Sequence, residues 1–398
     1  MRSAREVAEV LLKALEDKDL QAGLDRSILN SIPLIKGTLK RNPYIEDLAK
    51  RVKKAKDEVL GNIEYYIDKT MDNIRRFKGV AHFAKTREEV YKILDEVVGS
   101  EKMVVKAKSM VTEELKVREH LIERGNEVWE TDLGELLVQL DKSKPMHTIV
   151  PSIHITKERS AQLLRGLGFN GGVEEVREMI EFVRRFLRER FVKAHVGISG
   201  ANSVDANSGA VILVENEGNI RHVTNLPNIH VSIAGVEKIM PSYIDAICQA
   251  MVQAANIGTY PPTYLSAITG PSSTADIEFI RLYGVHGPKE LHIILYDGGR
   301  IKVLKEGIFA DQLHCIRCGR CQLECPIWQL AGNMWGGEVY GGPMGVIWTA
   351  ITEGVEKAAP LALFCLNCGK CKEVCPMDID IPNMMSELKR YYHDIRTS

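Results

Sequence analysis

The segment CIRCGRCQLECP, residues 315–326, returns near the end of the chain as CLNCGKCKEVCP, residues 365–376. In each copy three cysteines follow one another at three-residue steps, and a fourth stands four residues later, directly before a proline. Eight of the nine cysteines in the 398-residue chain lie in these two segments. A spacing repeated without change indicates that the eight thiols act together as ligands.

This spacing is the ligand run of bacterial-type ferredoxins, in which four thiolates hold one [4Fe–4S] cube. The three closely spaced cysteines wrap one cube, and the fourth reaches the other cluster. We therefore expect two [4Fe–4S] clusters and an electron-carrying role. The expected ligand sets are Cys315, Cys318, Cys321 and Cys375 for the first cluster, and Cys365, Cys368, Cys371 and Cys325 for the second.

Two other uses of cysteine fit the pattern less well. Structural zinc takes four ligands, usually as two separated pairs, and has no use for a third cysteine three residues on. A disulfide framework is typical of small secreted chains. The ninth cysteine, Cys248, lies in the apolar helical pattern IDAICQAMVQAA and is expected to be a buried core thiol.

Composition narrows the class of protein. Lys plus Arg (52) nearly equals Asp plus Glu (53), so no basic field favours nucleic acid. No stretch of about 18 uncharged apolar residues is present, so we expect no membrane span. Charges interrupt the N-terminal apolar residues, as a secretory signal would not allow. These features predict a cytoplasmic protein.

The chain divides into three predicted regions: an N-terminal helical region at 1–98, an α/β domain at 99–306 and a cluster module at 307–398. In the middle region strand patterns alternate with helical ones, which favours a largely parallel sheet. Ligands of such sheets bind beyond the carboxyl ends of the strands. The expected strands are MVVKAKSM, EVWETD, HTIVPSIH, HVGISGAN, AVILVEN, HVSIAGVEK and LHIILYD, after a short first strand in VAHFAK.

Three loops of the α/β domain carry polar or glycine-rich sequences suited to binding a small anion. Ordinary turn and helix-cap chemistry explains the same residue types, and this alternative stays open. No nucleotide-binding glycine motif is present. The candidate ligand-binding residues are Lys108 and Ser109, Gly200 and Asn202, and Thr269, Gly270, Ser272 and Asp276.

Charged and aromatic side chains accompany the cysteines. Arg317, Arg320, Lys370 and Lys372 lie within the ligand runs, where they are expected to raise the cluster potential or to dock an acidic partner. Three tryptophans of the module either shield the clusters from water or simply form core: Trp328, Trp335 and Trp348.

The chain resembles the iron–sulfur subunit family of lactate utilisation, the B component of a three-part system. The resemblance covers residues from about 75 to 395. It rests on KAKSMVTEEL, VWETDLGELLVQL, HTIVPSIHITKE, GISGAN, LVENEGNIRHVTNLPNIHVSIAGVEKIMP, TGPSSTADIE, GVHGPKELHIILYDGGR and the double cysteine run with GGEVYGGPMGVIW.

The resemblance implies a LUD domain, similar to the sugar-isomerase and CoA-transferase fold, followed by an α-helical two-cluster ferredoxin-like module. It also implies oxidation of L-lactate to pyruvate, together with a cysteine-rich-domain iron–sulfur protein and a second LUD protein. Where the family often has a glutamate after the GAN loop, this chain has the amide Asn207 nearby. That departure weakens a third interpretation, an independent CoA-type enzyme.

Two functional hypotheses follow. In the first, the protein is the electron-transfer subunit of a complex that oxidises L-lactate or a related 2-hydroxyacid. In the second, it is an electron-transfer adaptor for a heterodisulfide-reductase-like or other cysteine-rich-domain partner, without a substrate of its own.

Overall fold

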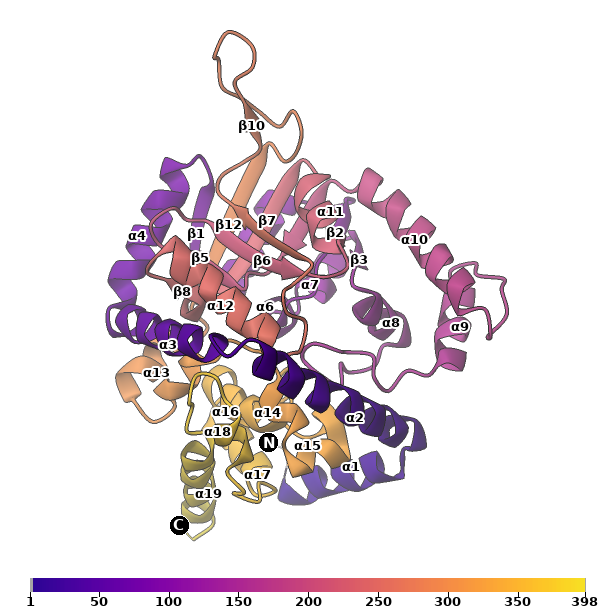
Figure 1. Ribbon diagram of the computed structural model, residues 1–398, viewed down its shortest axis with the longest axis vertical. Coiled ribbons are helices and arrows are strands. Elements are labelled where there is room, and N and C mark those ends of the chain that lie inside the picture. The colour runs from indigo at the N-terminus through magenta and orange to yellow at the C-terminus, as the bar shows by residue number, and fades with distance from the viewer. Residues whose placement is uncertain (1–2, 398) are drawn as a thin grey trace.

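A central sheet of six strands forms the middle of the molecule (Figure 1). The computed structural model describes residues 3–397. The strand order is β1-β12-β7-β4-β2-β3, and every neighbouring pair is parallel, which confirms the predicted α/β fold. The strands are β1 (Val80–Ala84), β2 (Met103–Lys106), β3 (Glu127–Glu130), β4 (Val196–Ser199), β7 (Ile229–Gly235) and β12 (Glu290–Tyr296).

Helices cover both faces of this sheet because its strands carry apolar side chains on both sides. On β12, Ile294 packs into the apolar cluster around α5, whereas Ile293 and Leu295 pack on the opposite face with residues of α4. The helices around the sheet are α4 (Ile63–Arg76), α5 (Arg87–Val98), α6 (Met110–Glu114), α7 (Val117–Glu123), α8 (Leu133–Asp141), α9 (Lys157–Arg165), α10 (Val176–Lys193), α11 (Asn219–Asn225) and α13 (Arg300–Glu306).

A smaller sheet of four strands lies beside the central one, in the order β8-β5-β6-β9. Helix α12 (Tyr243–Ala255) packs on it and buries Cys248, as expected for a core thiol. The short 3₁₀ helix η1 (Val236–Lys238) connects β7 to this sheet. Its strands are β5 (Ser203–Asp205), β6 (Val211–Glu215), β8 (Ile239–Met240) and β9 (Tyr264–Ile268).

A hairpin of β10 (Ser273–Thr274) and β11 (Leu282–Tyr283) projects from the body of the molecule (Figure 1). Its loop exposes large apolar side chains, including Phe279, which is 96% exposed. The predicted ligand-binding residues Thr269, Gly270, Ser272 and Asp276 all lie on this arm or at its base. The arm therefore carries one of the three predicted loops away from the sheet.

The N-terminal helices join the two halves of the protein. Helices α1 (Ala4–Glu16) and α2 (Lys18–Arg41) pack against the C-terminal module, through contacts with α15, whereas α3 (Ile45–Gly61) packs on α12. The predicted helical region 1–98 also contains β1 and α5, which belong to the central sheet and its cover.

The C-terminal module is α-helical, as expected, and follows α13 without a long linker. Its three tryptophans are fully buried, so they are core residues. No helix in the described part of the chain, residues 3–397, is long and apolar enough to cross a bilayer. The elements are η2 (Ala310–His314), α14 (Arg320–Leu323), α15 (Pro326–Ala331), η3 (Gly332–Met334), α16 (Gly342–Thr352), α17 (Val355–Ala362), α18 (Lys370–Glu373) and α19 (Ile381–Thr397).

One predicted strand was wrong. Residues 147–154 (HTIVPSIH) form no strand but a looped segment that lies against the C-terminal module. The Thr148 backbone N–H and hydroxyl both donate to Gln322 Oε1, and His147 Nε2 lies 3.4 Å from the Gly319 carbonyl oxygen. These polar groups therefore find partners in the first cysteine loop rather than in a neighbouring strand.

Candidate iron–sulfur centre and adjoining cavity

The two cysteine segments fold into nearly the same loop. Residues Arg317 and Asn367, two positions after the first cysteine of each loop, have φ values of 58° and 52°. Each donates its backbone N–H to the sulfur of that first cysteine at 3.4 Å. Backbone N–H groups that point at sulfur favour a thiolate over a thiol. The repeated sequence therefore gives a repeated ligand loop.

The loops bring the cysteines together in two crossed groups. Helices α14 and α18, which follow the loops, pack against each other. One cavity is lined by Cys325 of the first segment together with Cys365, Cys368 and Cys371 of the second. Cys375 of the second segment lies close enough to Cys318 and Cys315 of the first for charge on their sulfurs to raise its pKa. We call the set Cys315, Cys318, Cys321 and Cys375 group A, and the set Cys325, Cys365, Cys368 and Cys371 group B.

Burial makes thiolates costly in both groups. Burial raises the pKa of Cys375 to about 12, and the nearby sulfurs of Cys318 and Cys315 add to this effect. Burial likewise raises the pKa of Cys325 to about 11 despite backbone N–H donors from α15. Thiols in this setting become thiolates when a cationic centre sits among them. The donor set therefore fits a metal cluster.

The described side chains offer no ready site for a single metal ion. A zinc ion draws its thiolates to about 2.3 Å, so that they nearly touch one another. Within residues 3–397 no three Cys, His, Asp or Glu side chains converge closely enough to hold one ion. A [4Fe–4S] cube is held by four thiolates, and each of the two groups supplies four cysteines.

The two groups differ in their distance from solvent. All three loop cysteines of group A are buried, whereas Cys368 of group B is exposed and Cys365 is partly so. Leu366, between them in sequence, is 64% exposed. Trp335 lines the group B cavity, so this tryptophan both belongs to the core and keeps water from that side. Group B therefore forms the edge of the module that an outside partner can approach.

The charged residues within the cysteine runs have different surroundings. Lys370 pairs with Glu373 at 2.8 Å and Lys372 pairs with Asp380 at 2.6 Å, both near the surface. Arg320 donates to Asn256 Oδ1 at 3.0 Å. Of the four cations, only Arg317 is buried.

Arg317 takes part in an ion network that joins the α/β domain to the cysteine module. Its Nη2 atom lies 2.6 Å from Glu237 Oε1, and Arg300 Nε donates to the second oxygen of Glu237 at 2.7 Å. Arg300 also holds both oxygens of Glu114 at 3.1 and 2.8 Å, and the Tyr340 hydroxyl donates to Glu114 at 2.6 Å. Buried charges are tolerated when paired in this way.

Basic side chains outnumber acidic ones around Glu237, which favours a further anion nearby. Burial alone would raise the pKa of the Glu237 carboxyl, but Arg300 and Arg317 outweigh burial and lower this pKa to about 2. The two arginines balance Glu114 and Glu237, whereas Lys56 and Lys238 have no carboxylate partner within residues 3–397. Burial lowers the pKa of Lys56 to about 8 and that of Lys238 to about 7, whereas negative charge on the Cys315 sulfur acts in the opposite direction. A cube held by four thiolates carries net negative charge, so group A fits this positive surrounding.

A cavity of about 460 Å³ lies at the carboxyl ends of β2, β3, β4 and β7. This is the place where parallel sheets bind ligands. Lys108, Ser109, Gly200 and Asn202 line this cavity, so the structure brings four of the predicted ligand-binding residues together. The other four, on the projecting arm, lie outside it. Asn207 is also absent from its walls; its side-chain amide donates to the Pro241 carbonyl.

Gly200 lets two of these loops approach closely. A Cβ atom at this position would lie 2.3 Å from Ser109 Oγ and 2.7 Å from Ser109 Cβ, which no side chain could accept without movement. Glycine is therefore required here by close approach. Asn202 is fixed by its own partners, donating to Gln253 Oε1 at 2.6 Å and accepting from the Val214 N–H at 2.9 Å.

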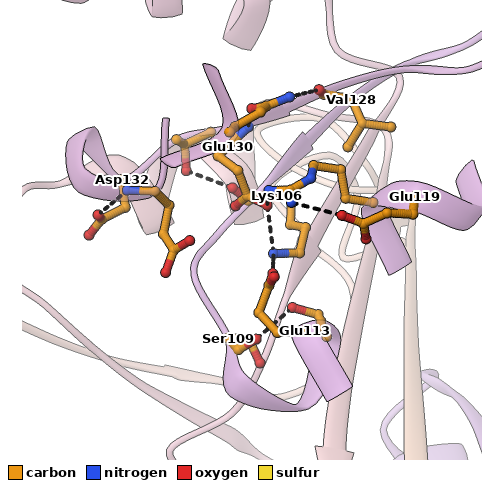
Figure 2. A network of polar contacts seen from close by, with 12 residues as sticks. Lys106, Ser109, Glu113, Glu119, Val128, Glu130 and Asp132 are labelled. Atoms are coloured by element: carbon orange, nitrogen blue, oxygen red, sulfur yellow. Dashed lines mark hydrogen bonds and ion pairs between the residues drawn. The ribbon is translucent and has the colours of Figure 1, made fainter. Parts of the chain in front are cut away.

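A buried ion network holds the loops after β2 and β3 (Figure 2). Lys106, at the end of β2, donates to Glu113 at 2.7 Å and to Glu130 at 2.8 Å. Because Glu113 belongs to α6 and Glu130 to β3, Lys106 fixes the loop that carries Lys108 and Ser109. Lys108 in turn donates to Asp132 at 3.2 Å. The walls of the cavity are therefore rigidly positioned.

Among the cavity residues that were not predicted as ligand-binding are two cations, Arg317 and Lys238. Arg317 reaches the cavity from the first cysteine loop, and Gln253 donates to its carbonyl oxygen at 3.4 Å. Lys238 follows β7 and is only 4% exposed. Because ligands bind such sheets at the strand ends, its position just after an apolar strand could have identified Lys238 from the sequence. The approach of Arg317 could not be read from the sequence.

Similar proteins agree with this arrangement. Residues 67–296 match the LUD domain family, and residues 311–379 match the 4Fe-4S dicluster domain. Lactate utilization protein B of Shouchella clausii is 34% identical over 358 residues, covering 87% of this chain and 73% of that protein. The same protein of Bacillus subtilis is 34% identical over 313 residues, covering 77% of this chain and 64% of that protein.

A third relative is the uncharacterized electron transport protein YkgF of Escherichia coli, 36% identical over 307 residues, which covers 76% of this chain and 62% of that protein. This chain thus spans less than two thirds of two of the three relatives. Among solved structures, a DUF162 family protein of Deinococcus radiodurans aligns with 60% of the chain at 10% identity and a TM-score of 0.32.

The fold and the cysteine loops define an iron–sulfur protein built on a LUD domain. Within this class, the chain belongs to the lactate utilization protein B family.

Proposed function

We propose that this protein is the iron–sulfur electron-transfer subunit of a complex that oxidises L-lactate, or a related 2-hydroxyacid, to the 2-oxo acid. Group A and group B would each hold one [4Fe–4S] cluster through their four thiolates. The observation that carries the proposal is the order of the sites from the inside of the protein outward. The cavity of the LUD domain comes first, then group A, then group B and then solvent. Arg317 belongs both to the cavity wall and to the loop of group A.

The order of the parts suits electron transfer between a substrate and a partner protein. Clusters of this type accept and release electrons one at a time. Conversion of L-lactate to pyruvate releases two electrons and two protons, so a carrier with two one-electron sites matches the reaction. The residues of this chain supply no hydride acceptor of their own, and a partner's cofactor is proposed for that step.

The exposed edge of group B is the proposed exit for electrons. Cys368 is exposed there, and Leu366 and Leu363 present apolar surface beside it. A small apolar contact that excludes water is typical of transient redox partners. The proposed partners are a cysteine-rich-domain iron–sulfur protein at this edge and a second LUD protein, as the resemblance to the lactate-utilisation family implies.

The alternative is an electron-transfer adaptor without a substrate of its own, serving a heterodisulfide-reductase-like or other cysteine-rich-domain partner. The exposed edge of group B suits this role equally well. The two functions differ in the use of the LUD cavity, which the adaptor would leave without ligand.

Anaerobic purification together with the proposed partner proteins, followed by addition of L-lactate, tests the proposal. The visible absorbance of the clusters should bleach and the EPR signal of reduced [4Fe–4S] clusters should rise on adding L-lactate. Reduction by a partner protein but by no 2-hydroxyacid would favour the adaptor. A colourless protein that contains zinc would contradict both functions.

A further inference from the structure

Lys238 is an unusual residue in this cavity. It lines the cavity from η1, directly after β7, and is 4% exposed. Within the described residues 3–397 its ammonium group makes no hydrogen bond and lies within ion-pair distance of no carboxylate. Burial, together with the nearby Arg317, lowers the pKa of Lys238 to about 7, while Glu237 acts in the opposite direction. An anion bound beside Lys238 would favour its charged form.

Neighbouring residues cannot supply that charge. Glu237, next to Lys238 in sequence, already pairs with Arg300 and Arg317. Among the cavity carboxylates, Asp132 is paired with Lys108 and Glu215 with Arg221, and Glu217 stands on the exposed side of the cavity. Lys238 and Arg317 both line the cavity, and the carboxylate beside them, Glu237, already pairs with Arg317.

Polar groups suited to a second functional group of the ligand line the same cavity. The Ser109 side chain has no hydrogen-bond partner within residues 3–397, whereas its backbone carbonyl accepts from Thr112 Oγ1. Asn202 and Gln253 are bonded to each other and thus give a fixed wall. A volume of about 460 Å³ leaves room for a small organic acid with bound water.

We propose that Lys238 binds the carboxylate of a small 2-hydroxy or 2-oxo acid at the inner end of the LUD cavity, beside group A. The choice of acid rests on the function proposed above; the anion site itself rests on the unpaired lysine and the cavity. Arg317, two residues after Cys315, lines the same cavity as Lys238, so the charge of a bound ligand lies close to group A. Because electrons add negative charge at group A, the carboxylate binds the oxidised protein more tightly than the reduced protein.

Equilibrium dialysis of the anaerobically purified holoprotein with radiolabelled pyruvate and L-lactate tests this site. Lys238→Met should weaken binding of both acids about ten- to a hundredfold, the range for a hydrogen bond to a charged group. Lys238→Arg should keep part of the affinity. Lys302→Met is the matched control, since this exposed lysine pairs only with Glu306 at 3.5 Å, and it should bind as wild type.

Two further readouts separate a binding role from a structural one. Iron content of Lys238→Met should equal that of the wild type, and its melting temperature should be no lower, since the change removes an unpaired buried charge. Dithionite reduction should weaken pyruvate binding to the wild type and to Lys302→Met alike.

Affinities of Lys238→Met within twofold of wild type would overturn the proposal, as would a wild-type protein that binds neither acid. Tighter binding of inorganic phosphate than of pyruvate would overturn the assignment to carboxylates. None of these results bears on whether partner proteins reduce the clusters. The electron-transfer function is therefore tested separately, by the cluster-reduction experiment described above.

Discussion

Arg317 of the first cysteine loop and Glu237 of the LUD domain form a buried ion pair, with 2.6 Å between Nη2 and Oε1. The residues come from regions 80 positions apart in the chain. The guanidinium also lies over the ring of Trp348, 4.4 Å from its centre. This contact joins the ligand cavity to the cysteine module and holds one cluster loop against the LUD domain.

Loss of the Glu237 carboxylate should destabilise that junction. Glu237→Gln leaves Arg300 and Arg317 buried with an uncompensated charge, and removal of one partner from a buried pair costs about 3–5 kcal/mol. Urea unfolding followed by circular dichroism under anaerobic conditions measures the change. Glu306→Gln, at an exposed pair, should change stability by less than about 0.5 kcal/mol. Equal stabilities of the two variants would contradict a central role for the junction.

Cluster loading should follow the crossed grouping of cysteines. Cys368→Ser removes one thiolate of group B and is expected to lower the iron content from about eight to about four per chain. Cys248→Ser is the control, because this thiol is buried in α12 away from both groups, and it should retain about eight. Iron analysis of anaerobically purified protein gives the answer. Iron loss in the Cys248 variant would refute the assignment.

Stability should depend on pH through Glu135. Burial, with the carboxylates of Glu130 and Glu113 nearby, raises the pKa of Glu135 from 4.5 to about 8. The folded protein therefore retains this proton up to about pH 8, whereas the unfolded chain releases it above about 4.5, so stability falls as the pH rises between these values. Glu135→Gln keeps the group neutral.

The melting temperature of Glu135→Gln should therefore exceed that of wild type at pH 8, with the difference shrinking toward pH 5. Scanning fluorimetry across this pH range measures it. Glu306→Gln serves as the exposed control and should show no such trend. A difference that is constant with pH would count against the assigned protonation.

The close contact between Gly200 and Ser109 should leave no room for a side chain at position 200. Gly200→Ala places a Cβ atom 2.3 Å from Ser109 Oγ and should cost about 1–3 kcal/mol by overpacking. The double variant Gly200→Ala with Ser109→Gly should recover most of this stability, since both close atoms are removed. Gly172→Ala, whose Cβ would meet Glu175 at an ordinary 3.7 Å, is the control. Thermal unfolding of the three variants is the measurement.

Local spacing in the sequence determined the cysteine chemistry. Ligands three residues apart share one loop whatever the surrounding fold. The two ferredoxin-like segments and the crossed grouping of their cysteines could therefore be predicted without knowledge of the tertiary structure. Alternation of strands and helices likewise predicted the parallel sheet, because apolar runs of that length bury strands on both faces. The loops after β2 and β4, predicted as ligand-binding, line one cavity because strand ends meet at one edge of such a sheet.

Tertiary structure alone decided which distant groups meet. The segment 147–154 has a strand-like sequence, yet its polar groups bond to the first cysteine loop, since Gln322 and Gly319 are brought beside it. The loop around residues 269–276 looked like an anion site but projects on an arm. Lys238 and Arg317 acquire their shared cavity only when the module folds back onto the LUD domain. Long-range charge pairing of this kind has no periodic signature in a sequence, because its geometry is set by packing rather than by spacing.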